Sequence, residues 1–90
     1  MTAATVLARD DVAATIVRCL RDIAANHRVE LPPEIDQDAS FASFGLDSLA
    51  MVELVARVGD ALEVDLEPEL AFNYPTIAAV SAHLAAREES

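Results

Sequence analysis

Ser48 carries the hydroxyl group with the clearest potential for chemistry, within the stretch FGLDSLAMVEL, residues 44–54. A nucleophilic serine needs a nearby base and an oxyanion hole. The chain has two histidines, His27 and His83, and the residues around the serine read GLDSL, which is not the G-x-S-x-G motif of many serine hydrolases. Hydrolase chemistry is therefore disfavoured, and we expect no catalytic residue.

Residue types that bind metals are present, but their spacing is wrong for a metal site. Cys19 is the single cysteine, so no intrachain disulfide can form, and a reducing cytoplasm is the expected location. One cysteine and two distant histidines lack the spacing of a zinc site. Asp36 and Asp38 lack the pattern of a calcium loop. We therefore expect no bound metal.

Ser48 is placed either to cap a helix or to carry a phosphate. Asp47 and Ser48 are both favoured N-cap residues, and Gly45 allows a sharp turn just before them. The first N–H groups of a helix are unpaired and carry partial positive charge, which favours a phosphate there. The neighbouring Asp47 carboxylate opposes it, so both interpretations stay open on these residues alone.

The elements that position this serine are predicted to be helices. Asp10 and Asp11 suit a helix start by capping and by charge, and the helical pattern ends at Asn26-His27. A cation is favourable at a helix C-terminus, so we assign His27 a structural role. A second helix is predicted over residues 48–62. The apolar residues of the first helix recur at helical spacing: Val12, Ile16, Cys19, Leu20 and Ile23.

A long connection, residues 28–46, joins these two helices. Pro32-Pro33 prevents a helix through its start. A structureless loop of this length is unusual in a compact domain. We therefore expect one short turn after Asp38 and several apolar residues that pin the loop to the core. These are Val29, Leu31, Ile35, Phe41, Phe44 and Leu46.

Two further helices complete the predicted fold. Pro68 suits the first turn of a short helix, residues 68–72, and Thr76 is placed to cap a last helix. That helix has an apolar stripe from which His83 is excluded, so we expect His83 to be exposed. The fold class is all-α: a small four-helix bundle with three main helices, one short helix and a long loop after the first helix. The apolar stripe of the last helix is Ile77, Val80 and Leu84.

A helical wheel of the second helix separates an apolar face from an acidic face. Leu49 falls on the acidic face, so we expect it to be exposed and, with nearby Ala56, to contact a partner. The acidic face includes an i,i+4 pair of Glu53 and Arg57, and its other members are Asp60 and Glu63. The apolar face is expected to hold Met51, Val52, Leu54, Val55, Val58 and Leu62, with Gly59 among them.

The net charge of −10, from 16 acidic residues against 6 arginines and no lysine, limits the class of partner. It argues against nucleic acid and against anionic membranes. It favours basic protein partners, or it serves solubility alone. No apolar run approaches the roughly 20 residues of a membrane span, and the stretch from Met1 to Ala4 lacks the basic and apolar regions expected of a signal peptide. Self-association is not indicated, so we expect a monomer.

Two stretches of the sequence resemble motifs of one family. FGLDSLAMVEL resembles the modification motif of acyl carrier proteins, and LAFNYPTIAAVSAHL, residues 70–84, resembles the closing segment of polyketide-synthase carrier domains. The resemblance covers residues 10–87, which we take as the carrier domain, with residues 1–9 as a lead-in and 88–90 as a tail. The Met1 start and the short end suit a free-standing carrier, and a domain cut from a larger synthase would look similar.

The resemblance implies a four-helix carrier fold in which Ser48 is the attachment point of 4′-phosphopantetheine, transferred from coenzyme A by a phosphopantetheinyl transferase. The terminal thiol of this arm then holds acyl groups as thioesters, and the chain itself catalyses nothing. The second helix resembles the recognition helix of the family, which implies docking to basic patches of an acyltransferase or acyl-loading ligase and of a ketosynthase. The implied docking residues are Asp47, Leu49, Glu53, Ala56, Asp60 and Glu63.

The class of cargo depends on a few residues. The sequence Gly45-Leu46-Asp47-Ser48 differs from the Gly-Gly-His/Asp-Ser of peptidyl carriers, which favours an acyl cargo. Arg57 departs from the more uniformly acidic second helix of fatty-acid carriers. The leading hypothesis is an acyl carrier in polyketide assembly, as a discrete carrier of a starter or specialised unit. A fatty-acid or peptidyl carrier, and an unmodified acidic helical adaptor, are the alternatives.

Overall fold

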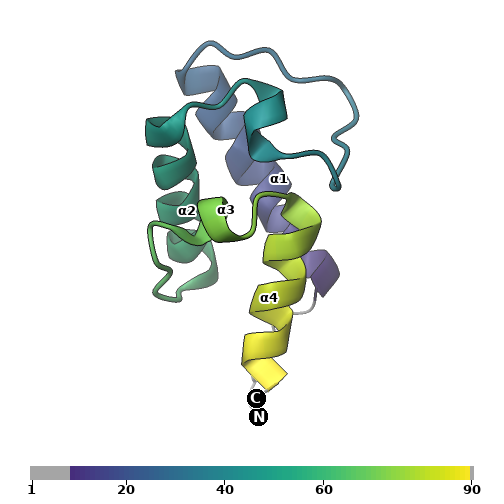
Figure 1. The fold of residues 1–90 in the computed structure, drawn as a ribbon, viewed down its shortest axis with the longest axis vertical. Helices are drawn as coiled ribbons and strands as arrows, with labels where there is room; N and C mark the ends of the chain where they lie inside the picture. The colour runs from purple at the N-terminus through teal and green to yellow at the C-terminus, as the bar shows by residue number, and fades with distance from the viewer. Residues whose placement is uncertain (1–8, 90) are drawn as a thin grey trace.

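The computed structural model describes residues 9–89, which form helices joined by loops (Figure 1). In chain order the elements are α1 (Arg9–Asn26), the 3₁₀ turn η1 (Phe41–Phe44), α2 (Ser48–Leu62), α3 (Leu70–Asn73) and α4 (Ile77–Glu89). This confirms the all-α bundle expected from the sequence, with three main helices, one short helix and a long loop after α1.

The boundaries of the first and last helices fall close to the ends of the described range. α1 already begins at Arg9, so Asp10 and Asp11 lie in its first turn rather than at its cap. Their carboxylates still complement the positive end of the helix dipole. α4 continues through Glu88 and Glu89, which belong to the expected tail. The expected lead-in before Arg9, and Ser90, lie outside the described residues.

α1 is the central helix of the bundle, because it packs against both α2 and α4, while α3 packs against α2 (Figure 1). The apolar positions predicted from helical spacing in α1 and α4 are buried. Burial of each large aliphatic side chain contributes about 1.5–3 kcal/mol to the free energy of unfolding. The largest of the fully buried side chains are Phe41, Ile16, Leu20, Ile23, Leu54, Ile77 and Leu84.

Val52 departs from the predicted apolar face of α2, because it is 37% exposed while Val55 is 5% exposed. On a helix with 3.6 residues per turn, Val52 and Gly59 point in nearly the same direction. Gly59 is buried, because Val64 and Leu66 of the following loop cover it. Val52 lies two turns earlier, at a level that this loop does not reach. A helical wheel projects every turn of α2 onto one circle. The segments that pack over α2 differ from one turn to the next, and the wheel does not show this.

The long loop after α1 is pinned to the rest of the fold, as its apolar content predicts. Phe41 and Leu46 are buried, and η1 is the short turn expected after Asp38. The Phe41 N–H donates to the Pro75 carbonyl at 2.8 Å, and the Ala78 N–H donates to the Gln37 carbonyl at 2.9 Å. These two bonds form a clasp between the loop and the start of α4.

The C-terminal elements follow the prediction except at two points. Thr76 caps α4, because its Oγ1 accepts a hydrogen bond from the Ala79 N–H at 3.0 Å. α3 begins at Leu70 and not at Pro68, because the Leu70 N–H donates to the Glu67 carbonyl in a turn before the helix. His83 is half-buried rather than exposed, since its ring stacks on Tyr74 with centroids 4.2 Å apart.

Candidate functional site

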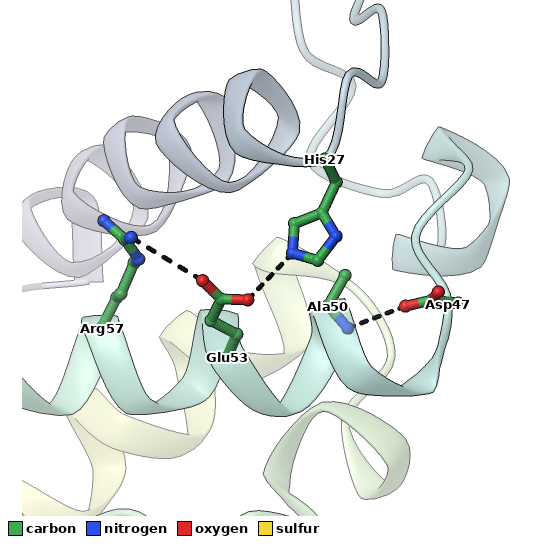
Figure 2. Close-up of polar contacts among 5 residues, drawn as sticks. All are labelled: His27, Asp47, Ala50, Glu53 and Arg57. Carbon is green, nitrogen blue, oxygen red and sulfur yellow. Dashed lines mark hydrogen bonds and ion pairs between the residues drawn. The ribbon is translucent and has the colours of Figure 1, made fainter.

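Asp47, and not Ser48, caps the start of α2. The Asp47 Oδ1 accepts a hydrogen bond from the Ala50 N–H at 2.8 Å, as Figure 2 shows, and the Asp47 carbonyl accepts the first helical bond from the Met51 N–H at 3.0 Å. Ser48 is therefore the first residue inside the helix, and it is exposed. Because Asp47 is the N-cap, the Ser48 hydroxyl is not needed to cap the helix.

The backbone before α2 turns sharply to place this serine at the surface. Gly45 has a φ of 91°, in the left-handed region that side chains other than glycine rarely adopt, and its N–H donates to the Ala42 carbonyl at 3.0 Å. Leu46 follows and is buried, with 5% of its surface exposed. The chain thus anchors Leu46 in the core and then emerges, so that Asp47 and Ser48 both lie outside.

The start of α2 fits an attached phosphate. The N–H groups of Ser48 and Leu49 come before the first helical bond, which the Met51 N–H makes. They lie at the positive end of a 15-residue helix, where negative charge is stabilised. The opposing Asp47 carboxylate is partly compensated, because it accepts the Ala50 N–H. An exposed hydroxyl at this position is accessible to a second protein that would modify it.

The side of α2 that faces away from the core is apolar near Ser48 and acidic at its other end. Leu49 is 69% exposed, which confirms the solvent-facing position predicted for it. Val52 and Ala56 are also exposed on this side. Asp60 and Glu63 follow towards the end of the helix and are exposed as well. We call this surface the outer face of α2.

Glu53 does not belong to the outer face alone, because its carboxylate is bound by two other side chains (Figure 2). The His27 Nε2 lies 2.8 Å from the Glu53 Oε1. The Arg57 guanidinium lies 3.7 Å from the Glu53 Oε2, which confirms the predicted i,i+4 pair. The contact with His27 joins the end of α1 to α2. It was not foreseen, because sequence spacing does not show which helix faces another.

Apart from Ser48, neither the thiol nor the metal-binding side chains within residues 9–89 offer an accessible group that could take part in acyl chemistry. Cys19 is buried, and this burial raises the pKa of its thiol, so little reactive thiolate forms at neutral pH. Within residues 9–89 there is no cluster of three side chains able to hold a metal ion. A thiol that carries an acyl group at the surface must therefore come from outside the chain.

One hollow in the interior of the bundle is very small. This hollow, between the core residues of α1, α2, α3 and α4, measures only about 10 Å³. This is roughly the minimum that one water molecule requires. It is lined by Phe41, Leu54, Val58, Ala71 and Val80, among others. In this conformation, an acyl chain would not fit in this hollow.

Comparison with known proteins identifies the family. A family model described as "Phosphopantetheine attachment site" matches residues 14–84. The chain is 33% identical over 88% of its length to the polyketide synthase ThaG of Burkholderia thailandensis. It is 36% identical over 73% of its length to the polyketide synthase PksM of Bacillus subtilis. The chain spans only 1% and 2% of these two synthases.

The fold agrees with a solved structure as well. A free-standing peptidyl carrier protein of Acinetobacter baumannii superposes with a TM-score of 0.72 and 33% identity, covering 90% of this chain and 96% of that protein. None of the helices within residues 9–89 has the length and apolar character needed to span a membrane. The chain belongs to the phosphopantetheine-binding carrier protein family, whose cofactor is covalently attached 4′-phosphopantetheine.

Proposed function

We propose that Ser48 carries the 4′-phosphopantetheine arm and that the chain presents acyl groups to the enzymes of polyketide assembly. The arm supplies a terminal thiol that holds acyl groups as thioesters. The observation that supports this assignment best is the division of labour at the start of α2, where Asp47 caps the helix and leaves Ser48 exposed. Similarity to polyketide synthases supports the class of cargo.

The residues around Ser48 position and stabilise this attachment, and we assign them no catalytic step. Gly45 and Leu46 fix the direction in which the chain enters α2. The N–H groups at the helix start stabilise the negative charge of a phosphodiester on Ser48. Purified chain should therefore show no turnover of acyl thioesters by itself.

The outer face of α2 is the proposed docking surface. Its candidate contacts are Asp47, Leu49, Glu53, Ala56, Asp60 and Glu63. Carrier domains meet a phosphopantetheinyl transferase and synthase partners, and here we propose an acyltransferase or acyl-loading ligase and a ketosynthase, in the cytoplasm, with the chain as a monomer. Exposed Leu49 provides apolar contact area, and the acids attract basic patches. The Glu53 carboxylate already contacts His27, so a partner protein that binds Glu53 must share this carboxylate with His27.

Mass spectrometry tests the attachment site. The purified chain is incubated with coenzyme A and a broad-specificity phosphopantetheinyl transferase, and it should gain the mass of one phosphopantetheine. Ser48→Ala should gain none, while Ser43→Ala, which removes another exposed serine in η1, should be modified like the original chain. An unmodified original chain, or a modified Ser48→Ala variant, contradicts the proposal.

A peptidyl carrier is the second candidate, because the solved structure with a TM-score of 0.72 is a peptidyl carrier protein. Loading experiments separate the two functions. The phosphopantetheinylated chain is offered to an acyltransferase with malonyl coenzyme A and, separately, to an adenylation enzyme with its amino acid and ATP. The polyketide function predicts loading by the first enzyme, and loading by the second alone would favour the peptidyl function.

A further inference from the structure

A second surface of the molecule lies at the other end of α2 from Ser48. A groove of about 880 Å³ runs between the loop after α2, the short helix α3 and α4. In Figure 1 this loop and the middle of α4 lie towards the lower part of the molecule, away from the start of α2. The groove is lined by Asp65, Leu66, Glu67, Leu70, Tyr74 and His83, among others.

The groove combines stacked aromatic rings with carboxylates. The Tyr74 and His83 rings have centroids 4.2 Å apart and planes inclined by 18°, and both residues are half-buried. Asp65 and Glu67 are exposed and line the same groove. Leu66 adds a half-buried apolar wall. Two aromatic rings that each keep one face clear of the stack, negative charge and an apolar side chain therefore line one groove.

The charge around the groove is unusually one-sided. Residues 60–69 contain five of the 16 acidic residues of the chain and no basic residue. Such a concentration of one sign attracts a cationic group and raises its rate of encounter. It also repels phosphate groups, which disfavours nucleotides as ligands. Within residues 9–89, the side chains that line the groove belong to no cluster of three that could hold a metal ion.

A guanidinium group matches this combination better than an ammonium group does. Guanidinium is planar, stacks on aromatic faces and bonds carboxylates through two N–H groups at once. The lysine ammonium is a strongly hydrated point charge that cannot stack in this way. We propose that this groove binds an arginine side chain of a partner protein, as a docking site separate from the outer face of α2.

The position of the groove indicates what such binding would achieve. α2 has 15 residues, and a rise of 1.5 Å per residue makes it about 22 Å long. A partner whose contact is confined to the groove and the loop after α2 would therefore leave the start of α2 uncovered. This site would tether the carrier to a partner while Ser48 stays accessible to other enzymes. The inference does not depend on which group Ser48 carries.

Nuclear magnetic resonance with peptide probes tests the proposal. The isotope-labelled full chain is titrated with an acetylated, amidated peptide of alternating arginine and glycine, and with the same peptide containing lysine. The arginine peptide should shift the signals of Leu66, Tyr74 and His83 and bind about fivefold tighter than the lysine peptide. Equal affinity for the two peptides, or shifts centred on the outer face of α2, would overturn it.

A pair of charge variants separates the groove from general attraction to an acidic protein. Asp65→Asn combined with Glu67→Gln should weaken binding of the arginine peptide about fivefold or more. The control removes two exposed acids of the long loop, Glu30→Gln with Glu34→Gln, and should change affinity less than about twofold. Equal losses in both double variants would show nonspecific attraction and refute the groove site.

Two single variants complete the test. His83→Ala removes one ring of the stack and should abolish the preference for arginine over lysine. Its helix content, measured by circular dichroism, must match that of the original chain. Ser48→Ala should bind the arginine peptide with unchanged affinity. A retained arginine preference in a folded His83→Ala variant would contradict the proposal, whatever the outcome of the attachment experiment.

Discussion

The two ends of α2 are fastened in different ways. At its start, a side chain caps the helix, because the Asp47 carboxylate accepts a hydrogen bond from the Ala50 N–H. At its end, backbone hydrogen bonds alone cap the helix. Glu63 adopts a φ of 59°, its N–H donates to the Asp60 carbonyl at 3.3 Å, and the Val64 N–H donates to the Gly59 carbonyl at 3.0 Å. This is a Schellman motif closed by a non-glycine residue.

The difference explains where the helix can accept a chemical change. At the start of α2, Ser48 and Leu49 are exposed. Their side chains do not make the capping bond, which Asp47 makes. The end is covered by its own loop, with the Val64 carbonyl packed close over Gly59. One end of the helix is therefore suited to carry an added group, and the other is suited to hold the bundle together.

Gly59→Ala should have the largest effect, at the covered end. A Cβ at this position would stand 2.9 Å from the Val64 carbonyl oxygen, which is a backbone atom with little freedom to move. We expect the free energy of unfolding to fall by about 1–3 kcal/mol, as in other overpacked sites. Urea denaturation measures this loss.

An exposed position on the same helix provides the control for this variant. Ala56→Gly should cost about 1 kcal/mol from helix propensity alone. By propensity alone, Gly59→Ala would instead stabilise the helix. A rise in stability of Gly59→Ala would therefore show that the loop does not restrict this end of α2.

Asp47→Ala should come next, at the exposed end. Loss of this cap should lower the free energy of unfolding by about 1 kcal/mol, whereas Ser48→Ala should change it by less than about 0.5 kcal/mol. Urea denaturation of both variants provides the comparison. Equal losses in the two variants would mean that Asp47 and Ser48 both cap the helix, which would contradict the assignment of the cap to Asp47.

Glu63→Gly should act in the opposite direction. Glycine adopts the left-handed conformation of this position without steric cost, so we expect a gain of about 0.5–1 kcal/mol in the free energy of unfolding. Thermal denaturation should show a higher midpoint. Glu67→Gly, which removes the same charge at a residue without positive φ, should show no gain. A similar gain in both variants would point to relief of charge repulsion instead.

The contact between His27 and Glu53 should have the smallest effect. The two side chains are 28% and 36% exposed, so solvent screens their interaction. A double-mutant cycle with His27→Ala and Glu53→Ala should give a coupling of about 0.5 kcal/mol. A coupling near zero would mean that the start of α2 is held to α1 by apolar packing alone.

Local patterns were enough to predict much of this fold. Helical spacing located the buried residues of α1, and the cap residue Thr76 located the start of α4. The turn at Gly45 and the helix start at Ser48 were predictable because they depend on neighbouring residues, whereas the sequence did not decide whether Asp47 or Ser48 is the cap. The exposure of Leu49 followed from its angle on a single helix.

Two features that sequence reasoning missed depend on how elements lie against each other. Val52 is exposed because the loop that covers Gly59 does not extend to it. His83 is half-buried because Tyr74, which follows another helix, stacks on it. A periodic pattern describes one helix at a time, so it does not reveal what lies across from each face.

The clasp between the long loop and α4 has a consequence for the order of events during synthesis of the chain. Gln37 and Phe41 bond to residues 75–78, which the ribosome adds only after all of α2 has been made. A nascent chain that ends with α2 lacks the partners that fix the loop leading to Ser48. The conformation of the loop that leads to Ser48 is therefore completed only after residues 75–78 have been added to the chain.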